Sequence, residues 1–253
     1  MARILVVEHE DGTGPGYLGE CLVEAGLELH VVRPYLDDRL PESLSGYDGF
    51  IVLGGTQSPF DDEAAPWLSA VRDLIRLALG ERLPLLGVCL GGEMLADVAG
   101  GQVTHATRGP EVGLRRLTKH PGAADDPLFG DLPDAAPAVE WHWEEILALP
   151  PGAVPLVGTE PYPHQAFRIG DTAWGLQFHP EVLTEAVNAW ADHARDHLAT
   201  EGRTPADVAD EVRVAEPELR EVWRGVARRW AGVIGPVADG RDGRSDGLRA
   251  ARC

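Results

Sequence analysis

Residues 85–92 read LLGVCLGG, an apolar run that breaks into a turn with Cys89 between two glycines. Gly-x-Cys-x-Gly is the cysteine form of the nucleophile elbow, where a strand turns sharply into a helix and small neighbours let the backbone pass close by. We therefore expect a strand over 85–88 and a helix over 93–99. A thiol at the start of that helix faces the positive end of the helix dipole, which favours the reactive thiolate. Taken alone, Cys89 could equally be a buried core cysteine.

A second apolar run, residues 174–181 (WGLQFHPE), ends in a histidine with a carboxylate two positions later. Residues i and i+2 of an extended segment point the same way, so Glu181 can hold the ring of His179 from behind. Cysteine, histidine and carboxylate are the nucleophile, the base and the group that orients the base in acyl transfer. The two motifs together predict this chemistry with Cys89 as the nucleophile.

With these motifs the sequence resembles the class I, or triad, glutamine amidotransferases, which carry a Gly-x-Cys-x-Gly elbow and a His-Pro-Glu near the domain end. Within that family it is most similar to stand-alone domains resembling the amidotransferase half of guanylate (GMP) synthetase. Further matching segments are 52–55 (VLGG), 141–145 (WHWEE) with 149–153 (LPPGA), and 165–168 (QAFR). The resemblance runs from Arg3 to the region of residue 235. It implies a flavodoxin-like, three-layer αβα fold with a mixed, mostly parallel sheet and a C-terminal helical extension.

The resemblance also implies the roles of individual residues. Cys89, His179 and Glu181 are the implied catalytic triad. The Cys89 thiolate would attack the side-chain amide of glutamine, and His179 would protonate the departing ammonia and then activate water to hydrolyse the γ-glutamyl thioester. The backbone N–H groups of Gly55 and Leu90 would form the oxyanion hole.

The implied substrate pocket departs from the family pattern at two places. Relatives commonly carry Gln four residues after the nucleophile, and here Glu93 would set a negative charge against the α-carboxylate of glutamine, unless it turns to solvent or to an arginine. Relatives often show His-Gly-Asp where this chain has His142, Trp143 and Glu144, the implied wall of the pocket. Alternation in 141–144 also fits a half-buried strand with both tryptophans on one face. Gly54 belongs to the implied pocket too, although a tight turn after a strand would explain it equally.

Composition agrees with this interpretation. With 253 residues and 44% hydrophobic residues, the chain can bury one full core, and one domain with an appendage is expected. A net charge of −19 disfavours binding to nucleic acid or to anionic membranes, and no run approaches the roughly 20 apolar residues of a membrane span. Three cysteines and nine histidines show no disulfide framework or metal-ligand spacing, so we expect no metal, no cofactor and a cytoplasmic protein.

Strands and helices alternate along the first half, which predicts a parallel sheet covered on both faces. Expected strands are 3–7, 28–32, 49–53, 85–88, 112–117, 138–143, 154–159, 166–169 and 172–178. Expected helices are 17–25, 65–79, 93–99, 184–197 and one that opens at Thr204, with proline at its first position. We expect an amidotransferase domain over 1–200, a helical extension packed on it over 201–235, and a disordered tail over 236–253.

Three hypotheses about function remain. The chain is a glutaminase that supplies ammonia to a separate synthetase, since it has no nucleotide-binding motif of its own. Alternatively it is a stand-alone hydrolase of γ-glutamyl amides or a related small metabolite, which Glu93 and Trp143 favour. A non-catalytic binding domain is disfavoured because no triad member is missing. Dienelactone hydrolases share the elbow, but they need an acid between cysteine and histidine on its own loop.

Overall fold

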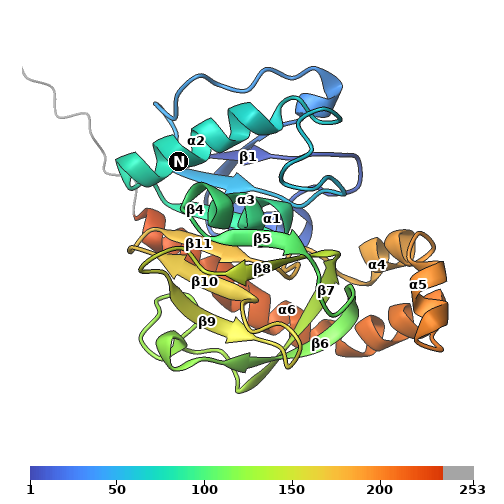
Figure 1. Ribbon diagram of the computed structural model, residues 1–253. Helices are drawn as coiled ribbons and strands as arrows, with labels where there is room; N and C mark the ends of the chain where they lie inside the picture. Colours follow the sequence, from blue (N-terminus) through green and yellow to red (C-terminus); the bar gives the residue numbers. More distant parts are fainter. Residues whose placement is uncertain (236–253) are drawn as a thin grey trace, which may run out of the picture.

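A nine-stranded sheet runs through the protein, and the computed structural model describes it within residues 1–235 (Figure 1). Five neighbouring strands are parallel, in the order β2 (Glu28–Val32), β1 (Arg3–Val7), β3 (Gly49–Val52), β4 (Leu85–Val88) and β11 (Ala173–Leu176). The sheet continues in antiparallel fashion through β10 (Ala166–Ile169), β9 (Val154–Gly158), β6 (Glu111–Lys119) and β7 (Ala135–His142). Strand β4 thus lies near the middle of the sheet.

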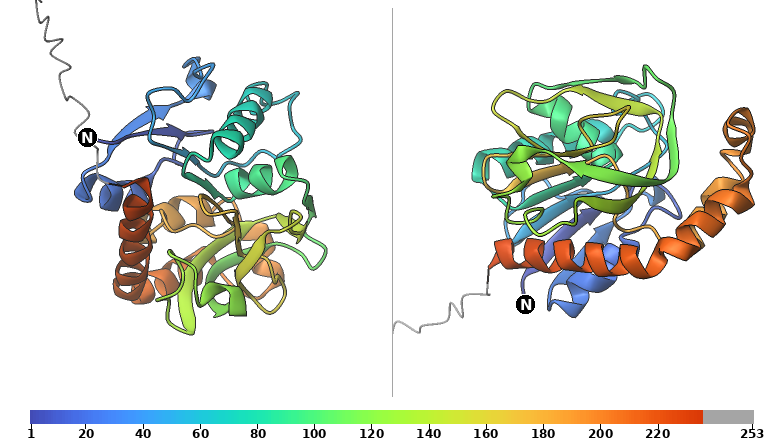
Figure 2. Two further views of the ribbon diagram at one scale, coloured as in Figure 1. Left: turned by 90° about the vertical axis from the view of Figure 1, so that its left-hand side faces the viewer. Right: turned by 90° about the horizontal axis from the view of Figure 1, so that it is seen from below.

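Helices cover both faces of the sheet, as Figure 2 shows. Helices α2 (Leu68–Glu81) and α3 (Leu90–Val98) pack on one face, and α1 (Gly16–Glu24), α4 (Thr184–Ala191) and α6 (Pro205–Ile234) pack on the other. Strand β1 explains why both faces are covered, because Ile4 and Val6 point into one core while Leu5 and Val7 point into the other. This is the three-layer α/β fold that we expected.

The long helix α6 begins where the sequence predicted. Thr204 accepts a hydrogen bond from the backbone of Asp207, and the Asp207 carboxylate bonds back to the Thr204 N–H, so the helix starts with a complete capping box. Its buried face includes Trp223, whose ring lies 4.8 Å from that of Phe178. The helix bends toward α5 (Arg195–Thr200), as the right-hand view of Figure 2 shows. Pro217 explains the bend, because proline lacks a helical N–H and clashes with the preceding turn.

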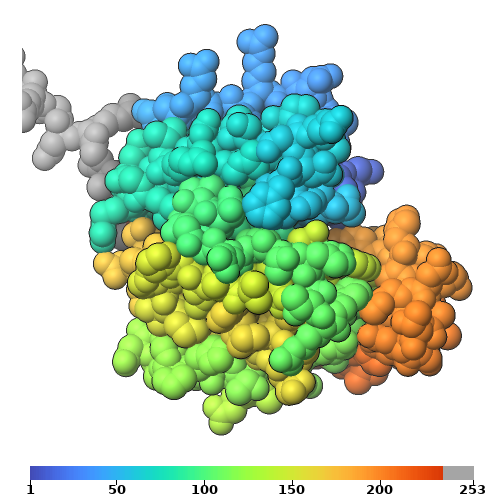
Figure 3. Space-filling model, viewed as in Figure 1, coloured from blue at the N-terminus to red at the C-terminus, as the bar shows by residue number. Residues whose placement is uncertain are grey.

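Several element boundaries differ from those expected. Helix α2 begins three residues late, and α3 begins directly after the elbow cysteine. The helix expected over 184–197 is split into α4 and α5, because the N–H of His193 bonds to the carbonyl of Trp190 and tightens the last turn. These two helices form a block at the side of the molecule, orange in Figure 3.

Strands β5 (Gln102–His105) and β8 (Glu144–Ala148) were not expected and form a separate two-stranded sheet. Short 3-10 helices, η1 and η2, occur at Pro34–Leu36 and Pro121–Ala123. The tail predicted over 236–253 lies outside the described residues, and the division between 1–200 and 201–235 stays a prediction. Among the residues described, no helix combines the length and the apolar character that a membrane span needs.

Candidate active site

The elbow places Cys89 at the carboxyl end of β4 and directly before α3. Its backbone has φ 49° and ψ −111°, a conformation that a non-glycine residue adopts only under strain. A Cβ on Gly87 would lie 2.4 Å from the carbonyl oxygen of Gly91, and one on Gly91 would lie 2.1 Å from that of Val52. The turn is therefore so tight that only glycine fits at either flank.

Neighbouring strand ends bring the other predicted residues to this point, because parallel strands present their carboxyl ends at one edge of the sheet. Gly54 follows β3, and His179 follows β11. A Cβ on Gly54 would lie 3.4 Å from the Cys89 Cβ and 3.1 Å from the His179 Cε1. The predicted nucleophile and the predicted base therefore border the same space beside Gly54, which a side chain at that position would fill.

Glu181 holds the His179 ring, as the i, i+2 spacing predicted. The Nδ1 of His179 lies 2.6 Å from the Oε1 of Glu181, and both side chains are buried. The carboxylate accepts the Nδ1 proton, so the lone pair of the imidazole resides on Nε2, which has no hydrogen-bond partner among the residues described. The Trp190 ring packs edge-on against the imidazole at 5.0 Å. His179 is thus oriented with a free basic nitrogen.

The thiol of Cys89 differs from our expectation. Burial raises its pKa well above the ordinary value, and the carboxylates of Glu93 and Glu181 raise it further. A hydrogen bond from the Leu90 N–H lowers the pKa, in the direction expected of a helix N-terminus, but it does not outweigh the other effects. The prediction that the helix start favours a resting thiolate is therefore wrong. Cys89 needs a base to remove its proton.

A cavity of about 600 Å³ lies over the thiol. The predicted site residues that line it are Cys89, His179, Gly55, Glu93, His142, Trp143 and Glu144. Gly54, Leu90 and Glu181 are not part of its lining. A Cβ added to Gly55 would lie 3.2 Å from the Leu90 Cδ2. The two residues predicted to form the oxyanion hole are therefore neighbours.

Residues 141–144 all contribute to the cavity lining, but the Trp141 ring packs on Trp190 whereas the His142 ring turns toward Glu111 and Glu140. The chain leaves β7 at His142 and enters β8, in the other sheet, at Glu144, so the strand geometry that alternation requires is interrupted at Trp143. His142 donates its Nδ1 proton to the carbonyl oxygen of Glu144 at 2.7 Å, which stabilises this turn. The half-buried strand expected through residue 143 therefore ends at His142, and Trp143 and Glu144 fall outside it.

Glu93 is buried and faces the cavity, so it turns neither to solvent nor to an arginine. It is 2% exposed, and its Oε1 accepts a hydrogen bond from the Nε2 of Gln177 at 2.7 Å. Burial raises the pKa of Glu93 to about 8; the bond from Gln177 lowers it and the charge of Glu144 raises it. Near neutral pH the side chain is therefore mostly an uncharged carboxylic acid.

The sequence analysis missed three neighbours of this site. Gln177 reaches both Glu93 and the Cys89 Sγ, which lies 4.0 Å from its Nε2, and its i−2 position relative to His179 was an available signal. Trp190 comes from α4, and no local pattern marks it. His9 follows β1 and packs behind the Gly55 loop, where burial lowers its pKa to about 4 and keeps it neutral.

Known proteins share this architecture. A family model described as "Glutamine amidotransferase class-I" matches residues 17–189. The chain is 38% identical over 155 residues to the GMP synthase (glutamine-hydrolyzing) of Porphyromonas gingivalis, but it spans only 28% of that protein's length, with 60% of this chain covered. It is 27% identical over 203 residues to gamma-glutamyl peptidase 3 of Arabidopsis thaliana, covering 77% of this chain and 79% of the peptidase. A glutamine amidotransferase of Thermotoga maritima of known crystal structure has a TM-score of 0.81 and 26% identity, covering 91% of this chain and 98% of the other.

Proposed function

The chain belongs to the class-I glutamine amidotransferase family, and on that basis we propose that Cys89, His179 and Glu181 hydrolyse the side-chain amide of glutamine. The observation that carries the proposal is the orientation of His179. Its Nδ1 lies 2.6 Å from Glu181, and its Nε2 has no hydrogen-bond partner within residues 1–235. Its ring and the elbow cysteine border the same space beside Gly54. A base held in this way can take the proton of the neighbouring Cys89 thiol, whose pKa is raised.

In the first step the Nε2 of His179 removes the thiol proton as the Cys89 Sγ bonds to the amide carbon. The carbonyl electron pair moves onto oxygen, and the N–H groups of Leu90 and Gly55 stabilise the oxyanion. The Leu90 N–H lowers the pKa of the Cys89 thiol, so it lies close to the reacting sulfur. Loss of one such donor costs about 3 kcal/mol of transition-state stabilisation.

In the second half, imidazolium returns its proton to the leaving nitrogen, and the carbon–nitrogen bond breaks to release ammonia and leave a γ-glutamyl thioester. His179 then takes a proton from water, whose oxygen attacks the thioester carbon. The carbon–sulfur bond breaks to free glutamate, and the imidazolium returns the proton to the Cys89 sulfur. Glu181 stabilises the imidazolium in both halves, since its carboxylate already accepts the Nδ1 proton. We propose that a separate synthetase consumes the ammonia, which the similarity to GMP synthases supports.

A second candidate is hydrolysis of larger γ-glutamyl amides by the same residues. The cavity of about 600 Å³ falls within the range of about 300–1,000 Å³ typical of pockets for drug-sized ligands. Three tryptophans, Trp141, Trp143 and Trp190, line it and offer a surface for a leaving group bulkier than ammonia. The similarity to gamma-glutamyl peptidase 3 also extends over most of both chains.

Turnover by the purified full chain tests both candidates. Glutamate release is measured with glutamine and with γ-glutamyl-alanine, for the wild type, for Cys89→Ser and for the control Cys21→Ser, which alters a buried cysteine outside the cavity. We expect the wild type and the control to be active and Cys89→Ser to be inactive with an unchanged circular dichroism spectrum. Wild-type turnover by a folded Cys89→Ser protein would refute the assignment of the catalytic triad. A preference for the dipeptide would select the second candidate.

A further inference from the structure

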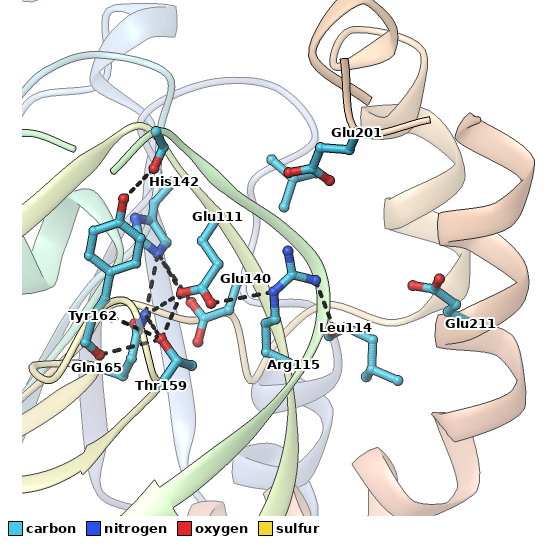
Figure 4. Close-up of polar contacts among 12 residues, drawn as sticks. Glu111, Leu114, Arg115, Glu140, His142, Thr159, Tyr162, Gln165, Glu201 and Glu211 are labelled. Carbon is cyan, nitrogen blue, oxygen red and sulfur yellow. Dashed lines mark hydrogen bonds and ion pairs between the residues drawn. The ribbon is translucent and has the colours of Figure 1, made fainter. Parts of the chain in front are cut away.

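Behind the cavity wall, three ionisable side chains converge between β6 and β7 (Figure 4). They are Glu111, Glu140 and His142, and each is at most 2% exposed. The strand register explains the convergence, because Glu111 pairs directly with His142, and Glu140 lies two residues before His142 on the same face of β7. One ligand atom from each residue lies within 4.8 Å of the other two.

The hydrogen bonds of His142 determine which of its nitrogens faces this cluster with a lone pair. Its Nδ1 must carry a proton, because it lies 2.7 Å from the carbonyl oxygen of Glu144, which can only accept. The lone pair of the neutral ring is therefore on Nε2. That atom lies 3.5 Å from an oxygen of Glu111, 3.5 Å from an oxygen of Glu140 and 3.4 Å from the Nε2 of Gln165. The contact with Gln165 is long, and the same amide group donates to Glu111 at 2.7 Å, so the lone pair still faces two carboxylates. Two carboxylates repel it unless a metal ion or a proton lies between them.

The two carboxylates have very different surroundings. Glu111 Oε2 accepts hydrogen bonds from Gln165 Nε2 at 2.7 Å and from the hydroxyl of Thr159 at 3.1 Å, and Arg115 Nε lies 3.3 Å from its Oε1. Glu140 is 0% exposed, and neither of its oxygens has a hydrogen-bond partner among the residues described. A buried carboxylate without partners is unfavourable by several kcal/mol in proteins. Glu140 thus points to a ligand that supplies positive charge.

We propose that Glu111, Glu140 and His142 bind one divalent transition-metal ion, with Zn²⁺ as the best match. Imidazole nitrogen and carboxylate oxygen are zinc ligands, and two ligands of a tetrahedral zinc ion lie about 3.4 Å apart. His142 Nε2 already lies 3.5 Å from each carboxylate. Two carboxylates balance the charge of the ion, and the imidazole ligand disfavours Mg²⁺ and Ca²⁺, which take oxygen ligands.

The surrounding hydrogen bonds are those that orient metal ligands. A metal-bound histidine typically donates its other N–H to a carbonyl or carboxylate, as His142 does to Glu144. Gln165 and Thr159 hold the Glu111 carboxylate in a similar way. The ion would bridge β6 and β7 and lock the His142 ring, which lines the cavity. It would stabilise the cavity wall without taking part in bond breaking.

Metal titration tests this site, and it is done in the Cys89→Ser background so that the active-site thiol cannot bind zinc. The chelator-treated full chain is titrated with Zn²⁺ against a competing chelator, and its melting temperature is recorded with and without Zn²⁺. We expect one tight site and a higher melting temperature with the metal. Adding Glu140→Gln, which keeps the side-chain shape, should weaken binding about 100-fold or more and remove the thermal shift.

Glu145→Gln is the matched control, because Glu145 is also buried but bonds to the backbone N–H of Thr107, outside the cluster. This control should bind zinc as the parent does. Equal zinc affinity with and without Glu140→Gln would overturn the proposal, and so would the absence of any tight site in the parent. In the latter case, higher stability of Glu140→Gln without metal would identify a proton as the cation. If Glu140→Gln does not fold, anomalous diffraction from zinc-soaked Cys89→Ser crystals decides, since no peak between the three residues refutes the site.

Discussion

Glu93→Gln removes a titratable proton from the cavity while preserving the shape of the side chain. Glu93 is 2% exposed and accepts a hydrogen bond from Gln177 at 2.7 Å. Because burial raises its pKa to about 8, about nine-tenths of the molecules carry an uncharged carboxyl at pH 7. The sequence analysis expected Glu93 to set a negative charge against the α-carboxylate of glutamine, an effect that would already act at neutral pH. The structure moves that effect to alkaline pH.

The size of the effect follows from the pKa. If only the protonated form admits the α-carboxylate of glutamine, wild-type kcat/KM falls with the protonated fraction, about 1.1-fold at pH 7 and about 11-fold at pH 9 relative to acid pH. The variant lacks this loss. The ratio of kcat/KM, variant over wild type, should therefore rise about tenfold between pH 7 and pH 9, mainly through KM.

Glutamate release is measured for both proteins from pH 6 to pH 9.5 at limiting and saturating glutamine. The ratio is the informative quantity, because every titratable group other than the side chain at position 93 is the same in both proteins. Glu145→Gln, a buried substitution outside the cavity lining, should give a flat ratio. A flat ratio for Glu93→Gln as well, or a rise on the acid side, would refute the assignment of Glu93 to the substrate site.

Three further outcomes are expected. The folded-state pKa of Glu93 is raised, so the contribution of Glu93 to stability is fully present below pH 4.5 and falls by about 1.4 kcal/mol per pH unit up to about pH 8. In urea unfolding, the free energy of unfolding should fall less between pH 5 and pH 8 for Glu93→Gln than for the wild type. The electrophilic glutamine analogue diazo-oxo-norleucine should label Cys89, which lines the cavity together with His179, and spare Cys21, which is buried outside the cavity. Equal labelling of both cysteines in mass spectrometry would contradict this. Gly91→Ala should destabilise the protein by about 3 kcal/mol, because its Cβ would lie 2.1 Å from a carbonyl oxygen, whereas Gly80→Ala meets nothing within 4 Å and should be tolerated in the same thermal melts.

Local patterns predicted the parts of the site that local geometry determines. The glycines around Cys89 indicated the sharp strand–helix turn, and the i, i+2 spacing indicated that Glu181 holds His179, since both depend only on neighbours along the chain. The alternation of strands and helices likewise predicted the parallel half of the sheet. These inferences needed no knowledge of which segments meet in space.

Properties that depend on distant segments could not be predicted in this way. The pKa of Cys89 depends on burial and on carboxylates that include Glu181, which approaches from the end of another strand. The strand expected through residue 143 ends at His142 because the chain changes sheets at Trp143, a consequence of tertiary structure. The convergence of Glu111 on His142 depends on the register of two strands, which no spacing along the chain reveals.

The position of β11 has a consequence for synthesis on the ribosome. Strand β4, which carries the elbow, pairs on one side with β3 and on the other with β11, which is synthesised much later. Until β11 emerges, the nascent chain has an open apolar edge at the centre of its future sheet, the kind of edge that recruits other chains into aggregates. The segment that closes this edge also brings His179 and Glu181. The growing chain therefore acquires its proposed base only when its exposed edge is sealed, so protection from aggregation and chemical competence arrive in the same step.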